Sequence, residues 1–318
     1  MTKAEIYKLI QDFLRDPPIL IWGSGATCAY GLPSMNDLNN ILKEKFDFFD
    51  KNNTNLEEEL GKDKYEKHIN EIRKSIWSCV EQKDVEILNK ILIDFDRFKG
   101  IKQLIRVFTE PHPHVLNIIT TNYDRVLEYV LETSDIAFTD GFSGRLLSLF
   151  SEDFFKKTSD YPFVNLIKVH GSLNWFEING ETRYFNTNEK YVPKIIPPGK
   201  NKYKQAFWEP YRNLIQISDS AIKKSKSLLV VGFGFNDEHL TPRITDQIRK
   251  NMPIVVITKK MTNTTEEKLK IATNYLVLEE YKENKTKITY KKVNDKTNHI
   301  EITEGSLWKL DNFMEVLS

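Results

Sequence analysis

Short apolar runs recur along the chain, and most of them lead into a polar or glycine-rich segment. Runs of this length, bounded by turn residues, predict buried strands. Five candidate strands lie at residues 18–22, 114–122, 163–170, 227–235 and 252–259. Longer charged segments with apolar residues at helical spacing lie between them, and an amphipathic helix is expected over residues 3–15. Strands that alternate with helices predict a parallel, doubly wound α/β sheet with right-handed crossovers.

The stretch of about residues 41–112 has a charge-rich helical pattern without a convincing strand, so it predicts a helical insertion that forms a smaller lobe. The whole chain, residues 1–318, then forms a single domain. Its Rossmann-like core is expected over about residues 16–40, 113–175 and 207–260.

Two further segments complete this organisation. Residues 176–206 are rich in Asn, Lys, Pro and Gly, so we expect a loop or lid over the site. Residues 261–318 predict a small hairpin and a closing helix.

Composition restricts the class of protein. Lys plus Arg number 46 and Asp plus Glu number 45, which gives no overall charge to favour nucleic acid or membranes. The two cysteines, Cys28 and Cys79, cannot form a four-cysteine zinc site and offer little for a disulfide framework. Without a signal sequence or a long apolar run, we expect a soluble, cytoplasmic protein that binds neither membrane nor nucleic acid directly.

The first candidate strand leads into the segment GSGATCAYGLPS at residues 23–34. Gly23 permits a sharp turn, Gly25 permits close approach of backbone amides to a pyrophosphate, and Ser24 and Thr27 add hydroxyl groups. A glycine turn after a strand is also common without any ligand. In a parallel sheet, however, polar segments that follow several strands converge at one edge, which favours a nucleotide site.

The second strand ends in TTNYD at residues 120–124, where the Asn122 and Asp124 side chains can enter the same crevice. Asn122 can bind ribose hydroxyl groups or a water molecule. Asp124 can equally cap the helix that follows, because Asp is a good N-cap. For Asn122 the site role is favoured.

The segment KVHGSL places His170 at the end of the third strand. A neutral imidazole can accept a proton from a ribose hydroxyl or from water, as a general base requires. A lone histidine at a strand end is more often structural. We interpret the remaining histidines as structural or surface residues; they are His68, His112, His114, His239 and His299.

Together with GFGFND at residues 232–237, these segments resemble the sirtuin superfamily, and more closely its bacterial sirtuin-like branch found in anti-phage defence. The resemblance covers roughly residues 18–258. It implies NAD as the substrate and Asn122 and His170 as catalytic residues. It also implies NAD contacts from Gly23, Ser24, Gly25, Ala26, Thr27, Leu32, Pro33, Asp124, Gly232, Gly234 and Asn236.

Two departures bear on the reaction. Deacylating sirtuins hold a structural zinc with four cysteines, and they follow the glycine segment with G-I-P-x-F-R, whereas this chain has Gly31, Leu32 and Pro33 without that Phe and Arg. The resemblance therefore favours an NAD glycohydrolase (NADase) that needs no zinc and forms nicotinamide and ADP-ribose. The alternatives are an NAD-dependent protein deacylase and a non-catalytic sensor of NAD or ADP-ribose.

The defence branch also implies a setting in abortive infection, in which the enzyme depletes NAD. Such an activity must be held off until infection. We expect control by homo-oligomer formation or by a separate regulatory partner, such as an ATPase or an Argonaute-like protein, because residues after 260 are too few for an independent sensor domain.

Overall fold

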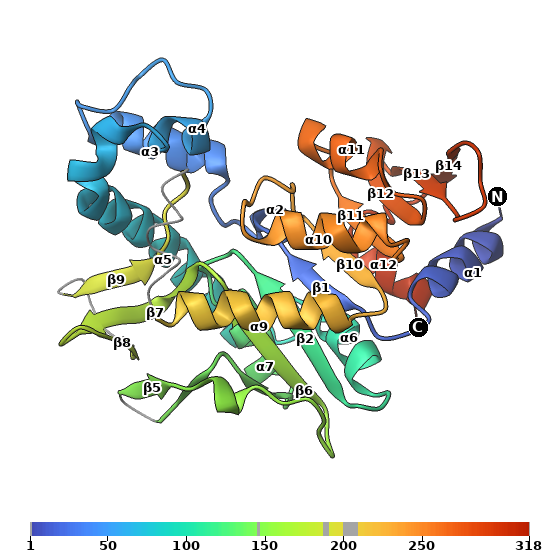
Figure 1. Ribbon diagram of the computed structural model, residues 1–318, viewed down its shortest axis with the longest axis horizontal. Coiled ribbons are helices and arrows are strands. Elements are labelled where there is room, and N and C mark those ends of the chain that lie inside the picture. Colours follow the sequence, from blue (N-terminus) through green and yellow to red (C-terminus); the bar gives the residue numbers. More distant parts are fainter. Residues whose placement is uncertain (1, 145–146, 187–190, 200–208, 318) are drawn as a thin grey trace.

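The computed structural model describes residues 2–144, 147–186, 191–199 and 209–317. Its largest element is a nine-stranded sheet (Figure 1). In spatial order the strands are β14 (His299–Glu304), β13 (Lys285–Lys291), β12 (Tyr275–Lys282), β11 (Ile254–Thr258), β10 (Leu228–Val231), β1 (Ile19–Trp22), β2 (Val115–Thr120), β6 (Phe163–Lys168) and β3 (Ala137–Thr139). The seven strands from β12 to β3 are parallel, and β13 and β14 add an antiparallel hairpin. The predicted α/β fold with a parallel sheet is confirmed.

The apolar runs have no polar alternation because central strands such as β1 and β10 are buried on both faces of the large sheet. In β1, Leu20 and Trp22 belong to one hydrophobic core, whereas Ile19 and Ile21 belong to the other. Helices α9 and α10 lie against one another on one face (Figure 1). Helix α6 packs on β2, and α1 and α12 contact one another beside it.

The helices over the large sheet have the following bounds. They are α1 (Lys3–Phe13), α2 (Ser24–Cys28), α6 (Lys99–Thr109), α7 (Val126–Glu132), α9 (Tyr211–Lys224), α10 (Leu240–Arg249), α11 (Asn263–Leu269) and α12 (Leu310–Leu317). Among the described residues, no helix combines the length and apolar character needed to cross a membrane.

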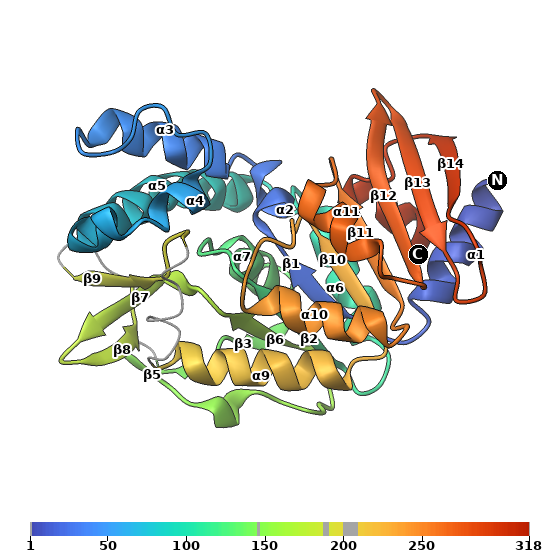
Figure 2. The same cartoon turned by 45° about the horizontal axis from the view of Figure 1, so that its top comes forward.

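A smaller lobe lies at the side of the large sheet away from β14 (Figure 2). Its helical part contains α3 (Met35–Lys45), α4 (Leu56–Leu60), η1 (Asp63–His68) and α5 (Ile69–Ile93). A second, antiparallel sheet packs against α5 through β7 and β9. Its strands in spatial order are β4 (Phe142–Ser143), β5 (Ser148–Phe150), β8 (Glu181–Tyr184), β7 (Gly171–Ile178) and β9 (Val192–Ile195), and the short helix η2 spans Glu152–Phe154.

This second sheet differs from the expectation of a loop or lid over residues 176–206. Residues 181–184 and 192–195 are strands, and Ile195 and Ile196 are buried. Residues 187–190 and 200–206 of the predicted lid lie outside the described residues. The apolar residues of this segment are divided between the two hydrophobic cores, with Ile195 in one and Ile196 in the other, which a polar composition does not reveal.

Two smaller differences concern the ends of predicted segments. Helix α6 lies within the predicted insertion, yet it packs against β2 and so covers the large sheet. The C-terminal hairpin forms as β13 and β14, but it continues the large sheet through β12.

Candidate functional site

The carboxyl ends of β1 and β10 lie side by side at the centre of the large sheet. After β1 the chain continues to β2 on one side, and the later strands β10 and β11 are added on the other. This reversal of strand order is a topological switch point, where open α/β sheets bind their ligands. The predicted glycine segment and the GFGFND segment are the two turns at this point.

The two turns are in direct backbone contact. Gly23 donates its N–H to Val231 O at 2.9 Å, and Gly25 donates to Gly232 O at 3.0 Å. Gly232 has φ +60°, and a Cβ there would lie 2.1 Å from Ala26 N. The glycines therefore serve first to bring these two turns together.

The predicted phosphate contacts at residues 23–27 are only partly available. The N–H groups of Gly25 and Ala26 already donate to Gly232 O and Gly23 O, and α2 has only five residues. Ser24 and Gly234 both line the adjacent cavity. In this structure the glycines shape the wall, and Ser24 offers a polar group on it.

The loop after β2 presents Asn122 toward α2. Asn122 Nδ2 donates to Thr27 Oγ1 at 3.1 Å, and its backbone N–H donates to Thr120 Oγ1 at 3.0 Å. Thr120 in turn donates to Trp22 O at 2.8 Å. The backbone bonds hold the loop, and the bond from Nδ2 directs that end of the amide toward Thr27. Oδ1 is the acceptor of the side chain, which can accept a hydrogen bond from water or a hydroxyl group.

Asp124 both accepts a backbone hydrogen bond at the start of α7 and lines the cavity, as its position in the sequence allows. Its Oδ1 accepts the Val126 N–H at 3.3 Å at the start of α7, and its Oδ2 lies 3.3 Å from Thr27 Oγ1. Burial raises the pKa of Asp124 to about 7, Lys168 opposes this, and the nearby Asp84 and Glu128 carboxylates add to it. A neutral carboxyl group at Asp124 is therefore available close to neutral pH.

Replacing Asp124 by Asn is expected to change how stability depends on pH. Because the folded-state pKa of Asp124 lies above that of the unfolded chain, the folded wild type loses stability relative to the variant as pH rises from about 4 to about 7. Urea unfolding of both proteins at pH 5 and pH 8 measures this change. The free energy of unfolding of Asp124→Asn, relative to that of the wild type, should be higher at pH 8 than at pH 5. An equal free-energy difference at both pH values would contradict the assignment.

His170 lies where the chain passes from the large sheet to the second sheet. β6 ends at Lys168, and Gly171, with φ +86°, begins β7. The His170 ring is buried, and its Nε2 lies 3.0 Å from Asp237 Oδ2. The His239 ring stands edge-on to the His170 ring, with 6.3 Å between the ring centroids. His239 therefore lies beside a predicted site residue, which its sequence position did not indicate.

A cavity of about 160 Å³ brings these segments together. Its walls come from both sides of the switch point and from the smaller lobe. The lining includes Ser24, Thr27, Leu32, Pro33, Glu57, Asn122, Tyr123, Asp124, His170, Gly232, Gly234, Asn236 and Asp237. A larger cleft of about 1490 Å³ adjoins it, shares Ser24, Gly232, Gly234 and Asn236, and is also lined by Gly25 and Ala26.

The structure thus gathers the predicted site residues around two adjoining cavities. Asn122 and His170 both line the smaller one. Gly23 instead supports the wall through its contact with the β10 turn. Asp237, the last residue of the GFGFND segment, also lines the smaller cavity, although its sequence pattern did not predict it as a site residue.

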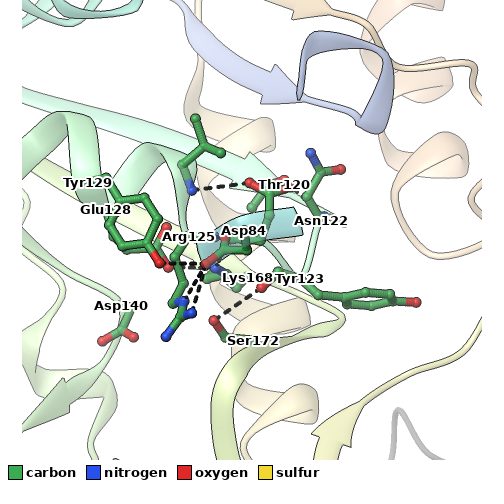
Figure 3. Close-up of polar contacts among 12 residues, drawn as sticks. Asp84, Thr120, Asn122, Tyr123, Arg125, Glu128, Tyr129, Asp140, Lys168 and Ser172 are labelled. Atoms are coloured by element: carbon green, nitrogen blue, oxygen red, sulfur yellow. Dashed lines mark hydrogen bonds and ion pairs between the residues drawn. The ribbon is translucent and has the colours of Figure 1, made fainter. Parts of the chain in front are cut away.

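A network of buried charges supports the Asn122 loop from below (Figure 3). Lys168 Nζ donates to Asp124 O at 2.6 Å and pairs with Glu128 at 2.5 Å. On the opposite side, Asp84 of α5 accepts the Arg125 backbone N–H at 2.6 Å and its Nε–H at 2.8 Å. The Tyr129 hydroxyl also donates to Asp84. The smaller lobe therefore holds the loop through one fully buried carboxylate.

Replacing Asp84 by Ala is expected to destabilise the fold by about 3–5 kcal/mol, because it leaves the mostly buried Arg125 guanidinium without its partner. Chemical denaturation measures the loss. Glu86→Ala is the matched control, since Glu86 lies on the same helix in an exposed pair with Lys83 and contributes about 1 kcal/mol or less. Equal losses for the two variants would contradict the role given to Asp84.

No cluster of three or more His, Cys, Asp or Glu side chains that could hold a metal ion occurs among the described residues. Cys28 and Cys79 are free thiols. Cys28 borders the larger cleft, and burial raises its pKa to about 11, so it is a weakly nucleophilic thiol at neutral pH.

Comparisons with known proteins agree with this architecture. Residues 116–286 match the model of a family described as a SIR2-like domain. A solved structure described as the structural basis for the mechanism and regulation of Sir2 enzymes has 12% sequence identity and a TM-score of 0.50, and the match covers 99% of this chain and 98% of that chain. At this identity the structural match speaks for the fold alone.

Two other solved structures are of Sir2 homologues with ligands. One is a complex with NAD, at 15% identity over 85% of this chain and 87% of that chain, with a TM-score of 0.44. The other is a mutant in complex with ADP-ribose, at 13% identity over 98% and 94%, with a TM-score of 0.49. The comparison with curated proteins found no match.

Proposed function

The chain belongs to the SIR2-like domain family, and from this premise we propose that it is an NAD glycohydrolase that cleaves NAD to nicotinamide and ADP-ribose. The observation that carries the proposal is the shared cavity. Asn122, His170 and the Gly232 turn, which come from three separate segments, line one cavity at the switch point of the sheet. The adjoining cleft of about 1490 Å³ offers room for the ADP part of the dinucleotide.

In this proposal NAD bridges the two cavities, with its nicotinamide ribose beside Asn122 and His170. Ser24, Gly232, Gly234 and Asn236 border both cavities, so they would lie along the pyrophosphate and the adjoining ribose. Leu32 and Pro33 supply an apolar wall to the smaller cavity, which suits a flat aromatic ring.

The reaction breaks the bond between the nicotinamide ring nitrogen and the ribose C1′ atom. The bonding electron pair neutralises the cationic ring, and the ribose is left with carbocation character. Asn122 Oδ1 holds the attacking water or a ribose hydroxyl, since its Nδ2 is engaged by Thr27. His170 takes the proton that the water releases when its oxygen bonds to C1′. The protein thereby positions the water and accepts its proton.

The acidic groups around the cavity suit this charge distribution. Glu57 and Asp237 line the same cavity as Asn122 and His170. Negative charge in a confined cavity favours a developing cation. The same negative charge disfavours an anionic group in the smaller cavity. The cationic nicotinamide end of NAD is therefore expected there, and not the pyrophosphate.

We further propose that the chain is an NAD-depleting effector of anti-phage defence, controlled by self-association or by a separate regulatory partner. The test compares NAD in bacteria that carry either the wild-type chain or Asn122→Ala, before and after phage infection. NAD should fall after phage infection in wild-type cells alone. An equal NAD level in both strains throughout infection would contradict the defence role.

A further inference from the structure

His170 and Asp237 come from different parts of the chain and meet beside the smaller cavity. His170 follows β6, whereas Asp237 ends the turn between β10 and α10. Each side chain is 4% exposed, and both residues line the cavity. Two ionisable groups buried together at a cavity wall are a common feature of functional sites.

The two oxygens of the Asp237 carboxylate contact different groups, one on the backbone and one on His170. Oδ1 accepts the backbone N–H groups of His239 and Leu240, at 3.0 and 2.9 Å, and so caps α10. Oδ2 lies 3.0 Å from His170 Nε2. Because two backbone donors fix Oδ1, the position of Oδ2 is set by the start of α10 and not by free rotation of the side chain.

We propose that Asp237 is a positioning residue for His170, whose Oδ2 holds the imidazole in the tautomer and orientation that catalysis requires. This inference rests on the proposed function, in which His170 is the general base. Helix capping explains Oδ1 alone. The second oxygen needs a separate explanation, because a cap requires neither burial against an imidazole nor a place on the cavity wall.

The chemistry follows from the charge on Asp237. A carboxylate beside Nε2 favours the tautomer with hydrogen on Nε2, which leaves the other ring nitrogen to accept a proton from water or a hydroxyl group. When that nitrogen takes the proton, Asp237 stabilises the imidazolium without taking a proton itself. The Nε2 and Oδ2 atoms are within ion-pair distance but not aligned as a hydrogen bond, and such contacts commonly tighten on substrate binding.

Other titratable groups near His170 do not replace Asp237. Glu57, Tyr123 and Asp124 line the same cavity, and His239 stands edge-on at 6.3 Å between ring centroids. Among the carboxylates of the described chain, Asp237 is the one within ion-pair distance of His170. The orienting role therefore falls to the Asp237 side chain.

Two substitutions separate positioning from capping. Asp237→Asn retains one oxygen that can accept the backbone N–H groups at the start of α10. Its NH2 group then takes the place of Oδ2 beside His170, and an NH2 group cannot accept the Nε2 hydrogen. Asp237→Ser also keeps a good N-cap and is too short to reach His170. Asp246→Asn is the matched control, because Asp246 lies on α10 in an exposed pair with Arg249.

The experiment measures NAD hydrolysis and the ¹⁵N NMR signals of the His170 ring in the full chain. Both Asp237 variants are expected to lower kcat about 10- to 100-fold with KM for NAD little changed, since a positioned base contributes roughly 10²–10⁴-fold. The wild-type spectrum should show the Nε2–H tautomer, and Asp237→Asn should lose that preference. Asp246→Asn should match the wild type in both measurements.

The results distinguish a failure of the positioning role of Asp237 from a failure of His170 as the general base. Wild-type kcat in folded Asp237→Asn and Asp237→Ser, with His170→Ala inactive, would overturn the positioning role and leave the proposed function intact. Full NAD hydrolysis by His170→Ala would instead overturn the proposed base. In that case the tautomer measurement still decides whether Asp237 orients the ring, because it does not depend on turnover.

Discussion

His170→Ala and Asn122→Ala are each expected to abolish NAD consumption while the chain stays folded. Removing the imidazole removes the proton acceptor, and a positioned general base contributes about 10²–10⁴-fold to the rate. Removing the Asn122 amide removes the group that orients the water or the ribose. Its loop remains held by the backbone hydrogen bond to Thr120 and by the pair between Arg125 and Asp84.

Circular dichroism and thermal melting of the same preparations show whether the variants are folded. His299→Ala is the matched control for His170→Ala, because His299 lies on the edge strand β14 and is partly exposed. It should consume NAD at the wild-type rate. Wild-type turnover by either folded site variant would show that its side chain does not serve the reaction.

Gly232→Ala is expected to have the second large effect, on NAD binding as well as on stability. A Cβ at residue 232 would lie 2.1 Å from Ala26 N and 2.5 Å from Gly25 C, and both are backbone atoms that cannot rotate away. The two turns must therefore separate, which breaks the Gly25 to Gly232 hydrogen bond and alters both cavities. We expect NAD affinity to fall at least about 10-fold, equivalent to about 1.4 kcal/mol.

Gly180→Ala is the control that separates the steric clash of Gly232→Ala from the backbone strain of placing Ala at a positive φ. Gly180 also has a positive φ, of +81°, in the turn between β7 and β8, but a Cβ there meets no atom within 4 Å. Both variants carry a strain of roughly 1–2 kcal/mol from the left-handed conformation, and Gly232→Ala alone carries the clash. Calorimetric titration with NAD should therefore show wild-type affinity for Gly180→Ala. Equal affinity for both variants would contradict the proposed place of NAD.

The strands that carry the site could be predicted from the sequence because parallel strands covered on both faces appear as continuous apolar runs. The polar and glycine residues at the ends of these runs could also be singled out, including Gly25, Asn122 and His170. The boundaries were less exact: the strand predicted over residues 227–235 ends at Val231, so Gly232 lies in the turn after β10. The order of the strands could not be read in this way. The contact between Gly25 and Gly232 depends on β1 lying beside β10, although more than 200 residues separate them.

The residues that the sequence did not reveal are polar side chains with unusual surroundings. Asp84 lies in a charge-rich amphipathic helix, where a carboxylate normally faces solvent, yet it is fully buried against Arg125 and Tyr129. Asp237 follows a glycine turn and precedes a helix, so it has the pattern of an ordinary cap, which Oδ1 indeed provides. Only the packing of distant segments shows that the second oxygen of Asp237, Oδ2, lies beside His170.

The second sheet was missed for a related reason. Strand β8 has the sequence ETRY, with Glu181 exposed, and so lacks the apolar alternation typical of a strand. An Asn179–Gly180 turn, a combination that favours tight hairpins, is the local signal that could have revealed it. Both residues have positive φ, as such a turn requires.

NAD hydrolysis is tested most directly by mass spectrometry of the products that form when the purified chain is incubated with NAD. We expect nicotinamide and ADP-ribose in equal amounts without any acyl-lysine peptide, and one oxygen atom from the solvent in the ADP-ribose. Intact NAD in the absence of peptide, with nicotinamide released only when an acyl-lysine peptide is added, would contradict this expectation and identify a protein deacylase.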